Sequence, residues 1–398
     1  MRTAICNGKV ILPTRVLRGG TVITDRGIIE AVLPGGLPEG FVGQVVDAAG
    51  RYVSPGFVDI HTHGAGGHDY MDGTVDAIVS AARMHASHGA TSILPTTLTS
   101  ELSELFDLFD VFSAAKEELV VGPELLGIHL EGPYFSYEQR GAQDPRYLRL
   151  PEKEEYTQIL SRSHGLIRRW SIAPELPGAL PMGRYLREQG VVCSVAHTSA
   201  TFEEVQLATE NGYTLLTHFY SGMSGITRKH GFRIAGAIEA GYLLDELYVE
   251  VIADGCHLPE ALLRLITKCK AWDNICLVTD SMRASGMPEG EYLLGSIKNG
   301  TPVIVEDGVA KLPDRTAFGG SVCTPDRLVR TMLQLTDLPL PDAVNMASAV
   351  PCRIMGIDDR KGSLCIGKDA DIVLFDEDVT VSLVMARGNI LFQSKKDK

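Results

Sequence analysis

The chain has 398 residues, of which 44% are apolar and 22% are charged, and this composition is typical of a large globular protein. Its formal net charge of −13 argues against a nucleic-acid-binding surface, because such surfaces are basic. The length exceeds that of one small domain and allows a large buried core.

The N-terminal stretch MRTAICNGKVILPTRVLRGG has scattered charges and lacks the apolar centre of a signal peptide. No other stretch approaches the length of a membrane span. The eight cysteines are widely spaced and form no CxxC pair, which indicates reduced thiols. We therefore expect a cytoplasmic protein that binds a small molecule and neither nucleic acid nor a membrane.

Both ends of the chain have the pattern of β-strands. Residues 1–54 contain short runs such as AICNGKVIL and GTVITDRGIIEAVL, broken by glycine and proline. Residues 357–398 return to such runs in ADIVLFDEDVTVSLVMARGNILF. Because each segment alone would bury too little surface, we predict that the two ends together form one small β-sandwich domain.

Residues 55–356 repeat a pattern of strand, polar loop and helix, which predicts a parallel α/β sheet. Helical stretches include VDAIVSAARMHASHG, TFEEVQLATENG and LPEALLRLITKC. The candidate strands begin near Phe57, Thr91, Leu125, Arg169, Val191, Thr214, Tyr248 and Ile275. Eight such strands predict a (β/α)₈ TIM barrel.

Potential metal ligands follow several of these apolar runs. They are His61 and His63 in FVDIHTH, Glu131 in LLGIHLEGP, His197 in VVCSVAHT, His218 in LLTHFYSG and Asp280 in ICLVTDSM. A single histidine after a strand is more often a core or rim residue, but strand ends are where a barrel collects its catalytic groups. Side chains two apart on a strand point the same way, so His61 and His63 can bind one ion. Together these residues predict a divalent metal site, with zinc as the expected ion.

The motifs PGFVDIHTHGAGGHD, LEGPYFS, SVAHTSAT, LLTHFYSGMSG, VIADGCHLP, VTDSM and GKDADIVLFD span nearly the whole chain. In these motifs the sequence resembles the amidohydrolase superfamily and, within it, the N-acetylglucosamine-6-phosphate deacetylase family. The resemblance implies hydrolysis of the acetamide of an N-acetylhexosamine 6-phosphate, which releases acetate and the amino sugar. It also implies a homodimer.

The resemblance also implies roles for the ligand residues. Glu131, His197 and His218 are the expected core ligands, and His61 and His63 complete that site or hold a second ion, so one or two ions bind each subunit. A metal ion lowers the pKa of bound water to about 7, which makes hydroxide available at neutral pH. Asp280 is the expected general base and acid, although an aspartate here could instead cap the following helix.

Substrate contacts are implied in the loops that follow the strands. His257 in ADGCHLP matches a substrate-contacting histidine, with an ordinary loop histidine as the alternative. Gln143 stands where the family usually has histidine, and Ser221 and Gly222 stand where it has Asn-Ala. Glutamine can donate to a sugar or acetyl oxygen but cannot become cationic, so a different sugar epimer or a different anion stays open.

Two further segments are candidates for ligand contact. Arg228 and Lys229 follow the sixth strand near the expected phosphate position, although basic loop residues are more often simply solvated. TAFGGS, which contains Phe318, resembles the family's substrate loop, with a plain turn as the alternative. We assign no function to the remaining histidines, His68, His85, His88, His129, His164 and His230.

The sequence leaves three hypotheses. The first is metal-dependent deacetylation of N-acetylglucosamine 6-phosphate. The second keeps the metal core but changes the substrate, to a related sugar such as N-acetylgalactosamine 6-phosphate or to another small amide. The third is a non-catalytic relative, which the presence of every expected ligand argues against.

Overall fold

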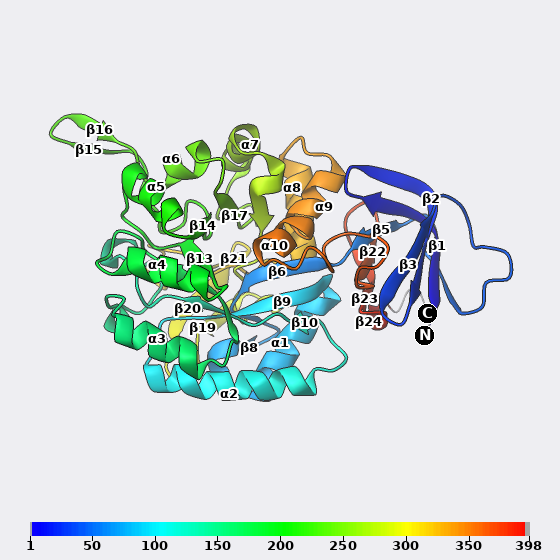
Figure 1. Ribbon diagram of the computed structural model, residues 1–398, viewed down its shortest axis with the longest axis horizontal. Helices are drawn as coiled ribbons and strands as arrows, with labels where there is room; N and C mark the ends of the chain where they lie inside the picture. Colours follow the sequence, from blue (N-terminus) through cyan, green and yellow to red (C-terminus); the bar gives the residue numbers. More distant parts are fainter. Residues whose placement is uncertain (1, 395–398) are drawn as a thin grey trace.

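The protein, analysed as a computed structural model that describes residues 2–394, consists of a helix-wrapped barrel beside a smaller strand-rich domain (Figure 1). The first and last described segments of the chain both lie in the smaller domain, at the side of the molecule away from most of the barrel helices. The predicted fold class, a parallel barrel with a β domain drawn from both ends, is confirmed. Among the described residues, no helix is both long enough and apolar enough to cross a membrane.

The β domain is one hydrogen-bonded sheet of strands in the order β24-β23-β22-β5-β1-β2-β3, with β4 paired to β1. Its strands are β1 (Thr3–Leu12), β2 (Arg15–Asp25), β3 (Ile28–Leu33), β4 (Gln44–Asp47), β5 (Tyr52–Pro55), β22 (Ile372–Phe375), β23 (Val381–Ala386) and β24 (Asn389–Gln393). Antiparallel pairing of β5 with β22 joins the two chain ends. The sheet has its own apolar core, in which Val10 and Val53 pack with Leu374.

The barrel strands run parallel to their neighbours. They are β6 (Phe57–Thr62), β9 (Ala90–Thr97), β11 (Ile128–Glu131), β12 (Ile167–Ile172), β13 (Val192–Val195), β14 (Tyr213–Leu216), β17 (Tyr248–Val251) and β18 (Ile275–Leu277), with short β10 (Glu124–Leu125) beside β9. Each predicted strand start lies close to one of these strands. The carboxyl ends of the strands therefore meet at one end of the barrel, as the position of the predicted ligands requires.

The helices cover the outside of the barrel. They are α1 (Val75–Ser87), α2 (Leu102–Glu118), α3 (Lys153–Arg162), α4 (Ala179–Glu188), α5 (Phe202–Glu210), α6 (Ala237–Leu243), α7 (Glu260–Cys269), α8 (Pro325–Leu335), α9 (Leu340–Met346) and α10 (Ala349–Ile354). Helix α5 shows how the sequence fixes a helix start, because Thr201 and Glu204 form a reciprocal capping box. Val205 and Ala208, three residues apart, are its buried face.

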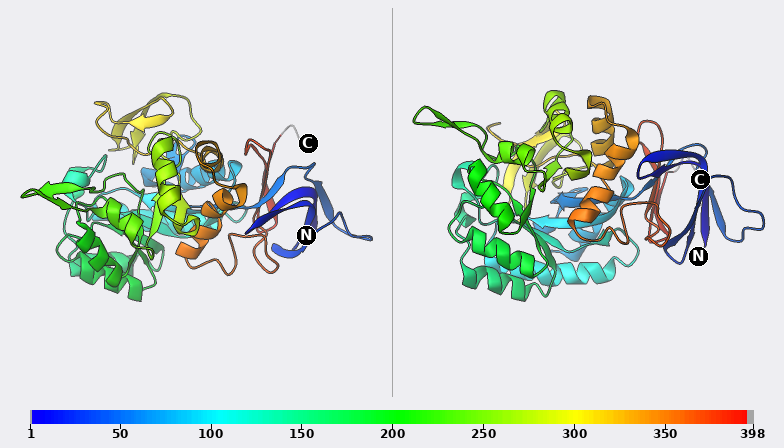
Figure 2. Two further views of the ribbon diagram at one scale, coloured as in Figure 1. Left: turned by 90° about the horizontal axis from the view of Figure 1, so that it is seen from above. Right: turned by 45° about the horizontal axis from the view of Figure 1, so that its top comes forward.

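Several small strands interrupt the barrel pattern, and the sequence analysis did not predict them. They are β7 (Gly64–Ala65), β8 (His68–Asp69), the hairpin of β15 (Thr227–Lys229) and β16 (Phe232–Ile234), and the sheet of β19 (Gly290–Leu294), β20 (Thr301–Glu306) and β21 (Val309–Lys311). The hairpin projects from the barrel on the side opposite the β domain (Figures 1 and 2). The three-stranded sheet lies between the last barrel strand and α8 in the sequence.

The first and last barrel strands meet through a short polar seam. The backbone N–H of Asp280 donates to the carbonyl of His61 at 2.8 Å, and the N–H of His63 donates to the carbonyl of Ser281 at 2.8 Å. Below them, the buried carboxylate of Asp59 accepts hydrogen bonds from the hydroxyl of Thr279 at 2.5 Å and its N–H at 3.3 Å. Burial raises the pKa of Asp59 to about 7 in spite of these donors. The seam closes the barrel and fixes the position of β6 against the loop after β18.

A buried ion cluster joins the C-terminal segment to the barrel. The ammonium of Lys361 lies 2.6 Å from Asp371 and 3.0 Å from both Glu124 and Asp369. Burial raises the pKa of Glu124, but the hydrogen bond from Arg360 and the charge of Lys361 outweigh burial and lower it to about 2. The cluster thus holds the barrel strand β10 against the segment that leads into β22. The domain limits at residues 54 and 357 stay a prediction.

We predict that Lys361→Met lowers the free energy of unfolding by about 3–5 kcal/mol, because it leaves buried carboxylates without their cation. Urea denaturation followed by circular dichroism measures this change. Lys311→Met is the control, since Lys311 forms only surface pairs with Glu306 and Asp307. Equal shifts of the denaturation midpoint in the two variants would contradict a stabilising role for the buried cluster.

Candidate active site

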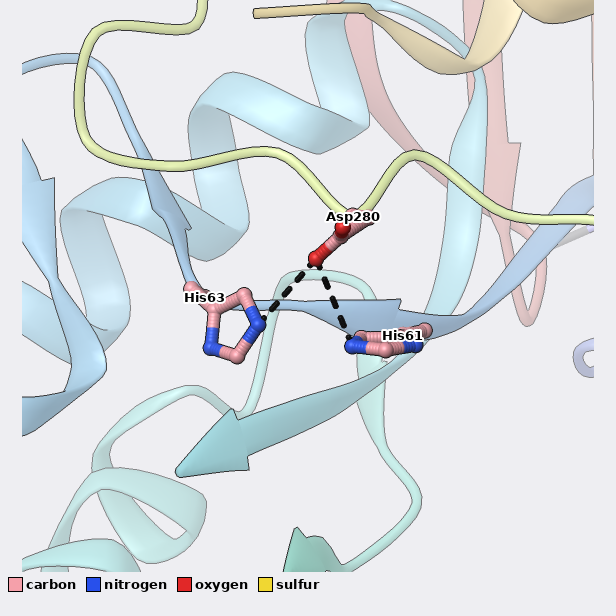
Figure 3. Close-up of side chains that lie close together, drawn as sticks. All are labelled: His61, His63 and Asp280. Atoms are coloured by element: carbon pink, nitrogen blue, oxygen red, sulfur yellow. Dashed lines mark ion pairs between the residues drawn. The ribbon is translucent and has the colours of Figure 1, made fainter. Parts of the chain in front are cut away.

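Six potential ligands converge at the carboxyl ends of the barrel strands, in two adjoining groups. The first group is His61, His63 and Asp280, and the second is Glu131, His197 and His218. Figure 3 shows His61, on strand β6, and His63, directly after it, pointing toward Asp280, which lies in the loop after β18. Nε2 of His61 is 3.4 Å and Nε2 of His63 is 3.1 Å from Oδ1 of Asp280. The six ligands that the sequence predicted are therefore brought together by the fold from the ends of five barrel strands.

Glu131 connects the two groups. Its Oε1 lies 3.0 Å from Nε2 of His218, 3.3 Å from Nε2 of His197 and 3.6 Å from Nε2 of His61. Its Oε2 lies 3.4 Å from Nε2 of His63. One buried carboxylate thus faces all four imidazoles.

Three of these residues have an unusual backbone. His197, His218 and Asp280 have φ angles of 43°, 32° and 45°, in the left-handed region that residues other than glycine rarely adopt. Each stands just after a barrel strand, where the chain turns away. Because such conformations cost free energy, their presence at three ligand positions marks the strand ends as a functional site.

The donor set fits a divalent cation. Nε2 of His61 is buried and has no hydrogen-bond partner among the described residues, although two carboxylates face it. Nδ1 of His197 donates to the carbonyl of Gln139 at 2.8 Å, so its Nε2 presents a lone pair toward Glu131. Four imidazoles with two carboxylates are ligands that zinc and similar ions accept.

The same carboxylates favour positive charge on the nearby imidazoles. Burial lowers the pKa of His63, but its hydrogen bonds with Asp280 and Glu131 outweigh burial and raise the pKa to about 10. For Asp280 the effects are reversed. Burial raises the pKa of its carboxyl group, but the charges of His61 and His63 outweigh burial and lower the pKa to about 2. A cation bound here would therefore compete with protons for the site.

The ligands lie at the base of a cavity with a volume of about 220 Å³. Gln143, Ser221, Gly222, His257 and Phe318, which the sequence proposed as substrate contacts, all line it. Gly222 has a φ of 57°, and a Cβ atom there would lie 2.8 Å from Nδ1 of His197. This position therefore excludes larger residues, because a side chain would displace the histidine.

Gln143 has a further role that the sequence did not indicate. Its Nε2 donates to Oε2 of Glu131 at 2.8 Å, and its Oε1 accepts the N–H of Thr99 at 3.1 Å. Both ends of the amide are thus engaged with the protein. Gln143 orients the shared carboxylate as well as lining the cavity.

His257 is held by a neighbouring carboxylate. Its Nδ1 donates to Oδ2 of Asp254 at 2.7 Å, and its ring packs on Phe318 with a centroid distance of 4.7 Å. The Nδ1 proton leaves Nε2 as the free ring nitrogen, which can accept a hydrogen bond or bind a proton. The TAFGGS segment thus contributes Phe318 to the wall of the cavity and is more than a surface turn.

Arg228 and Lys229 do not lie with the other predicted residues. Both are exposed on β15 of the projecting hairpin, and neither lines the cavity of its own chain. A role for them in anion binding stays a prediction.

Two histidines to which the sequence analysis assigned no function lie beside the site. His85, on α1, is buried, and its Nε2 lies 2.9 Å from Oγ1 of Thr62. Thr62 is the residue between the ligands His61 and His63 in the sequence. Burial lowers the pKa of His85 to about 4, so the ring is neutral at pH 7. His129 packs edge-on against His61 with a centroid distance of 4.7 Å. No signal in the sequence indicated that His85 lies beside the site, because His85 is on a helix and only the tertiary structure brings it to strand β6.

Comparison with known proteins agrees with this geometry. Residues 52–391 match the Amidohydrolase family. The N-acetylglucosamine-6-phosphate deacetylase of Bacillus subtilis (strain 168) is 33% identical over 97% of this chain and 96% of its own length. The N-acetylgalactosamine-6-phosphate deacetylase of Escherichia coli O157:H7 is also 33% identical, over 95% of this chain and 99% of its own.

Solved structures show the same similarity. The crystal structure of N-acetylglucosamine-6-phosphate deacetylase from Pasteurella multocida superimposes with a TM-score of 0.90 at 28% identity, covering 98% of this chain and 99% of that one. A mutant of the Mycobacterium smegmatis enzyme, in complex with N-acetyl-D-glucosamine-6-phosphate, gives 0.89 at 30% identity, covering 98% and 100%. The similarity therefore includes both the barrel and the β domain.

We predict that Glu131→Ala abolishes tight binding of divalent metal, because the carboxylate of Glu131 faces imidazoles of both ligand groups. Metal content after dialysis against a buffered zinc solution, measured by mass spectrometry, checks this. His230→Ala, at an exposed residue of the hairpin loop, is the control and should retain the wild-type content. Full metal occupancy in the Glu131 variant would contradict the proposed ligand set.

Proposed function

The chain belongs to the amidohydrolase family, and from this and the site geometry we propose that it deacetylates N-acetylglucosamine 6-phosphate to glucosamine 6-phosphate and acetate. The observation that carries the proposal is the pair of ligand groups joined by Glu131 at the base of a cavity. The enzyme is a hydrolase that acts on a linear amide C–N bond, and the reaction belongs to amino-sugar catabolism.

Glu131, His197 and His218 would hold one divalent ion, with zinc as the proposed metal. His61, His63 and Asp280 would hold a second ion, and the carboxylate of Glu131 faces this group as well. When bound, a divalent ion supplies Lewis acidity, which polarises a carbonyl oxygen and lowers the pKa of a coordinated water. The chain's own residues orient the substrate and move the protons.

Asp280 is the proposed proton carrier. It lines the cavity beside both ligand groups, and its pKa of about 2 keeps it ionised at neutral pH, so it can accept a proton. In the proposed reaction its carboxylate takes a proton from the attacking water and passes it to the departing amine nitrogen. Amide hydrolysis needs this second transfer because an unprotonated amine is a poor leaving group.

The remaining cavity residues are the proposed sugar contacts. His257 presents Nε2 from the loop after β17, and Phe318, packed against its ring, supplies an apolar surface. Gly222 lies beside His197 and Ser221 lines the same cavity, where these small residues leave room for the acetamide. Gln143 contributes mainly by holding Glu131.

The proposed assembly is a cytoplasmic homodimer. The projecting hairpin region leaves Ile226 and Phe232 exposed at 64% and 75%, and a second copy would cover these apolar side chains. Arg228 and Lys229 on the same hairpin are the proposed phosphate-binding residues, since arginine binds phosphate through two parallel hydrogen bonds.

The direct test is release of acetate by the zinc-loaded protein from N-acetylglucosamine 6-phosphate, its galacto epimer and both unphosphorylated sugars. We predict the highest kcat/KM for the gluco phosphate. The relative from Escherichia coli O157:H7 carries the galacto name at equal identity, so the epimer is the informative competitor. A preference for the galacto phosphate would reassign the substrate, and turnover of none of the four would refute sugar deacetylation.

We predict that Asp280→Asn lowers kcat by roughly 100- to 10,000-fold, because asparagine cannot accept the proton from the attacking water. The variant should fold normally and keep the ion at the Glu131 group. Asp307→Asn, at an exposed turn, is the matched control. Steady-state acetate release and metal content are the measurements, and near-wild-type kcat in the Asp280 variant would exclude its role in proton transfer.

A further inference from the structure

Two charged side chains are completely buried inside the barrel, and the proposed reaction uses neither of them. Arg169 lies on β12 and Glu250 on β17, and both are 0% exposed. Charged residues are almost never fully buried unless they are paired. A buried ion pair stabilises a fold no better than well-packed apolar side chains of the same size, so stability alone does not account for this pair.

Arg169 is fixed by contacts to four other strands. Its guanidinium donates to the carbonyl of Ile60 on β6 at 3.1 Å, to Ser194 on β13 at 3.1 Å and to Thr217 after β14 at 2.9 Å. It also donates to Oε1 of Glu250. Since the guanidinium is planar and these contacts surround it, Glu250 is held in one orientation.

The second oxygen of Glu250 is directed at the ligand histidines. Oε2 lies 3.2 Å from Nδ1 of His61 and accepts the backbone N–H of His218 at 3.1 Å. Because Oε1 faces the guanidinium of Arg169 and Oε2 faces the backbone N–H of His218, both oxygens of Glu250 act as acceptors. The proton of His61 therefore sits on Nδ1, and Nε2 is directed at Asp280 and Glu131.

We propose that Glu250, held by Arg169, is a positioning residue that fixes the tautomer of His61 and the backbone of His218, and thereby aligns one ligand from each metal-binding group. The inference rests on the metal site of the proposed function. A carboxylate bonded to the distal nitrogen of a ligating histidine increases its basicity and restrains its ring. Here a single carboxylate contacts ligands of both groups, so it also fixes the spacing between them.

The test compares Glu250→Gln with Glu124→Gln. Each variant removes one carboxylate from a largely buried ion cluster, but Glu124 pairs with Arg360 and Lys361 at the domain junction, away from the ligands. We expect Glu250→Gln to weaken zinc binding by roughly 10- to 100-fold in competition with a chelator. Glu124→Gln should bind zinc as the wild type does, even where it lowers the denaturation midpoint.

A second readout does not depend on metal or on turnover. The proton on Nδ1 of His61 gives a downfield NMR resonance when it is bonded to a carboxylate, and His61→Asn identifies it by its loss. Glu250→Gln should move this resonance upfield or lose it to solvent exchange. Unchanged zinc affinity together with an unchanged resonance in a folded Glu250→Gln variant would overturn the proposal.

Where the single variant does not fold, Arg169→Met combined with Glu250→Gln removes both charges and leaves no unpaired one. The same two readouts then apply, and wild-type zinc affinity in the double variant would equally overturn the proposal. Failure of the proposed function looks different, because the wild-type protein would then bind zinc without deacetylating the sugars, or would bind no zinc at all. In that case the resonance of His61 would still decide whether Glu250 fixes its tautomer.

Discussion

The site depends on the closure of the barrel between its first and last strands. His61 lies on strand β6 and His63 directly follows it, and the loop after β18 carries Asp280, so one ligand group lies across the seam. The backbone hydrogen bonds that close the barrel involve the same residues, from Asp280 to His61 and from His63 to Ser281. Barrel closure and assembly of this ligand group are therefore one structural event.

Beneath the ligands, the barrel interior contains a buried polar layer. Asp59, His129, Arg169 and Glu250 are buried there, and each is hydrogen bonded within the barrel. Such a network is costly unless all its members are satisfied, and once satisfied it allows few alternative arrangements. The interior thus gives up some hydrophobic stabilisation and gains a fixed orientation of the ligands above it, as catalysis by preorganised groups requires.

The sequence predicted the parts of the molecule that local pattern determines. Apolar runs located the barrel strands, and polar residues at the ends of those runs located His61, His63, Glu131, His197, His218 and Asp280. Contacts across the barrel were not predictable in this way. Glu250 interrupts the apolar strand YVEV, and that anomaly was the one available signal of a buried charge, but its partners come from distant strands. The β15–β16 hairpin was missed because two three-residue strands leave too short a pattern.

The pairing of β5 with β22 has a consequence for the newly made chain. The sheet needs residues 52–55 and 372–375 together, so it cannot be completed until nearly the whole polypeptide has left the ribosome. Gly56 alone separates β5 from β6, the strand that bears His61 and leads directly into His63. During synthesis the first barrel strand is therefore made before the neighbouring sheet can be completed, and the edge of β5 stays unpaired. Truncation near the C-terminus would leave this edge exposed next to β6.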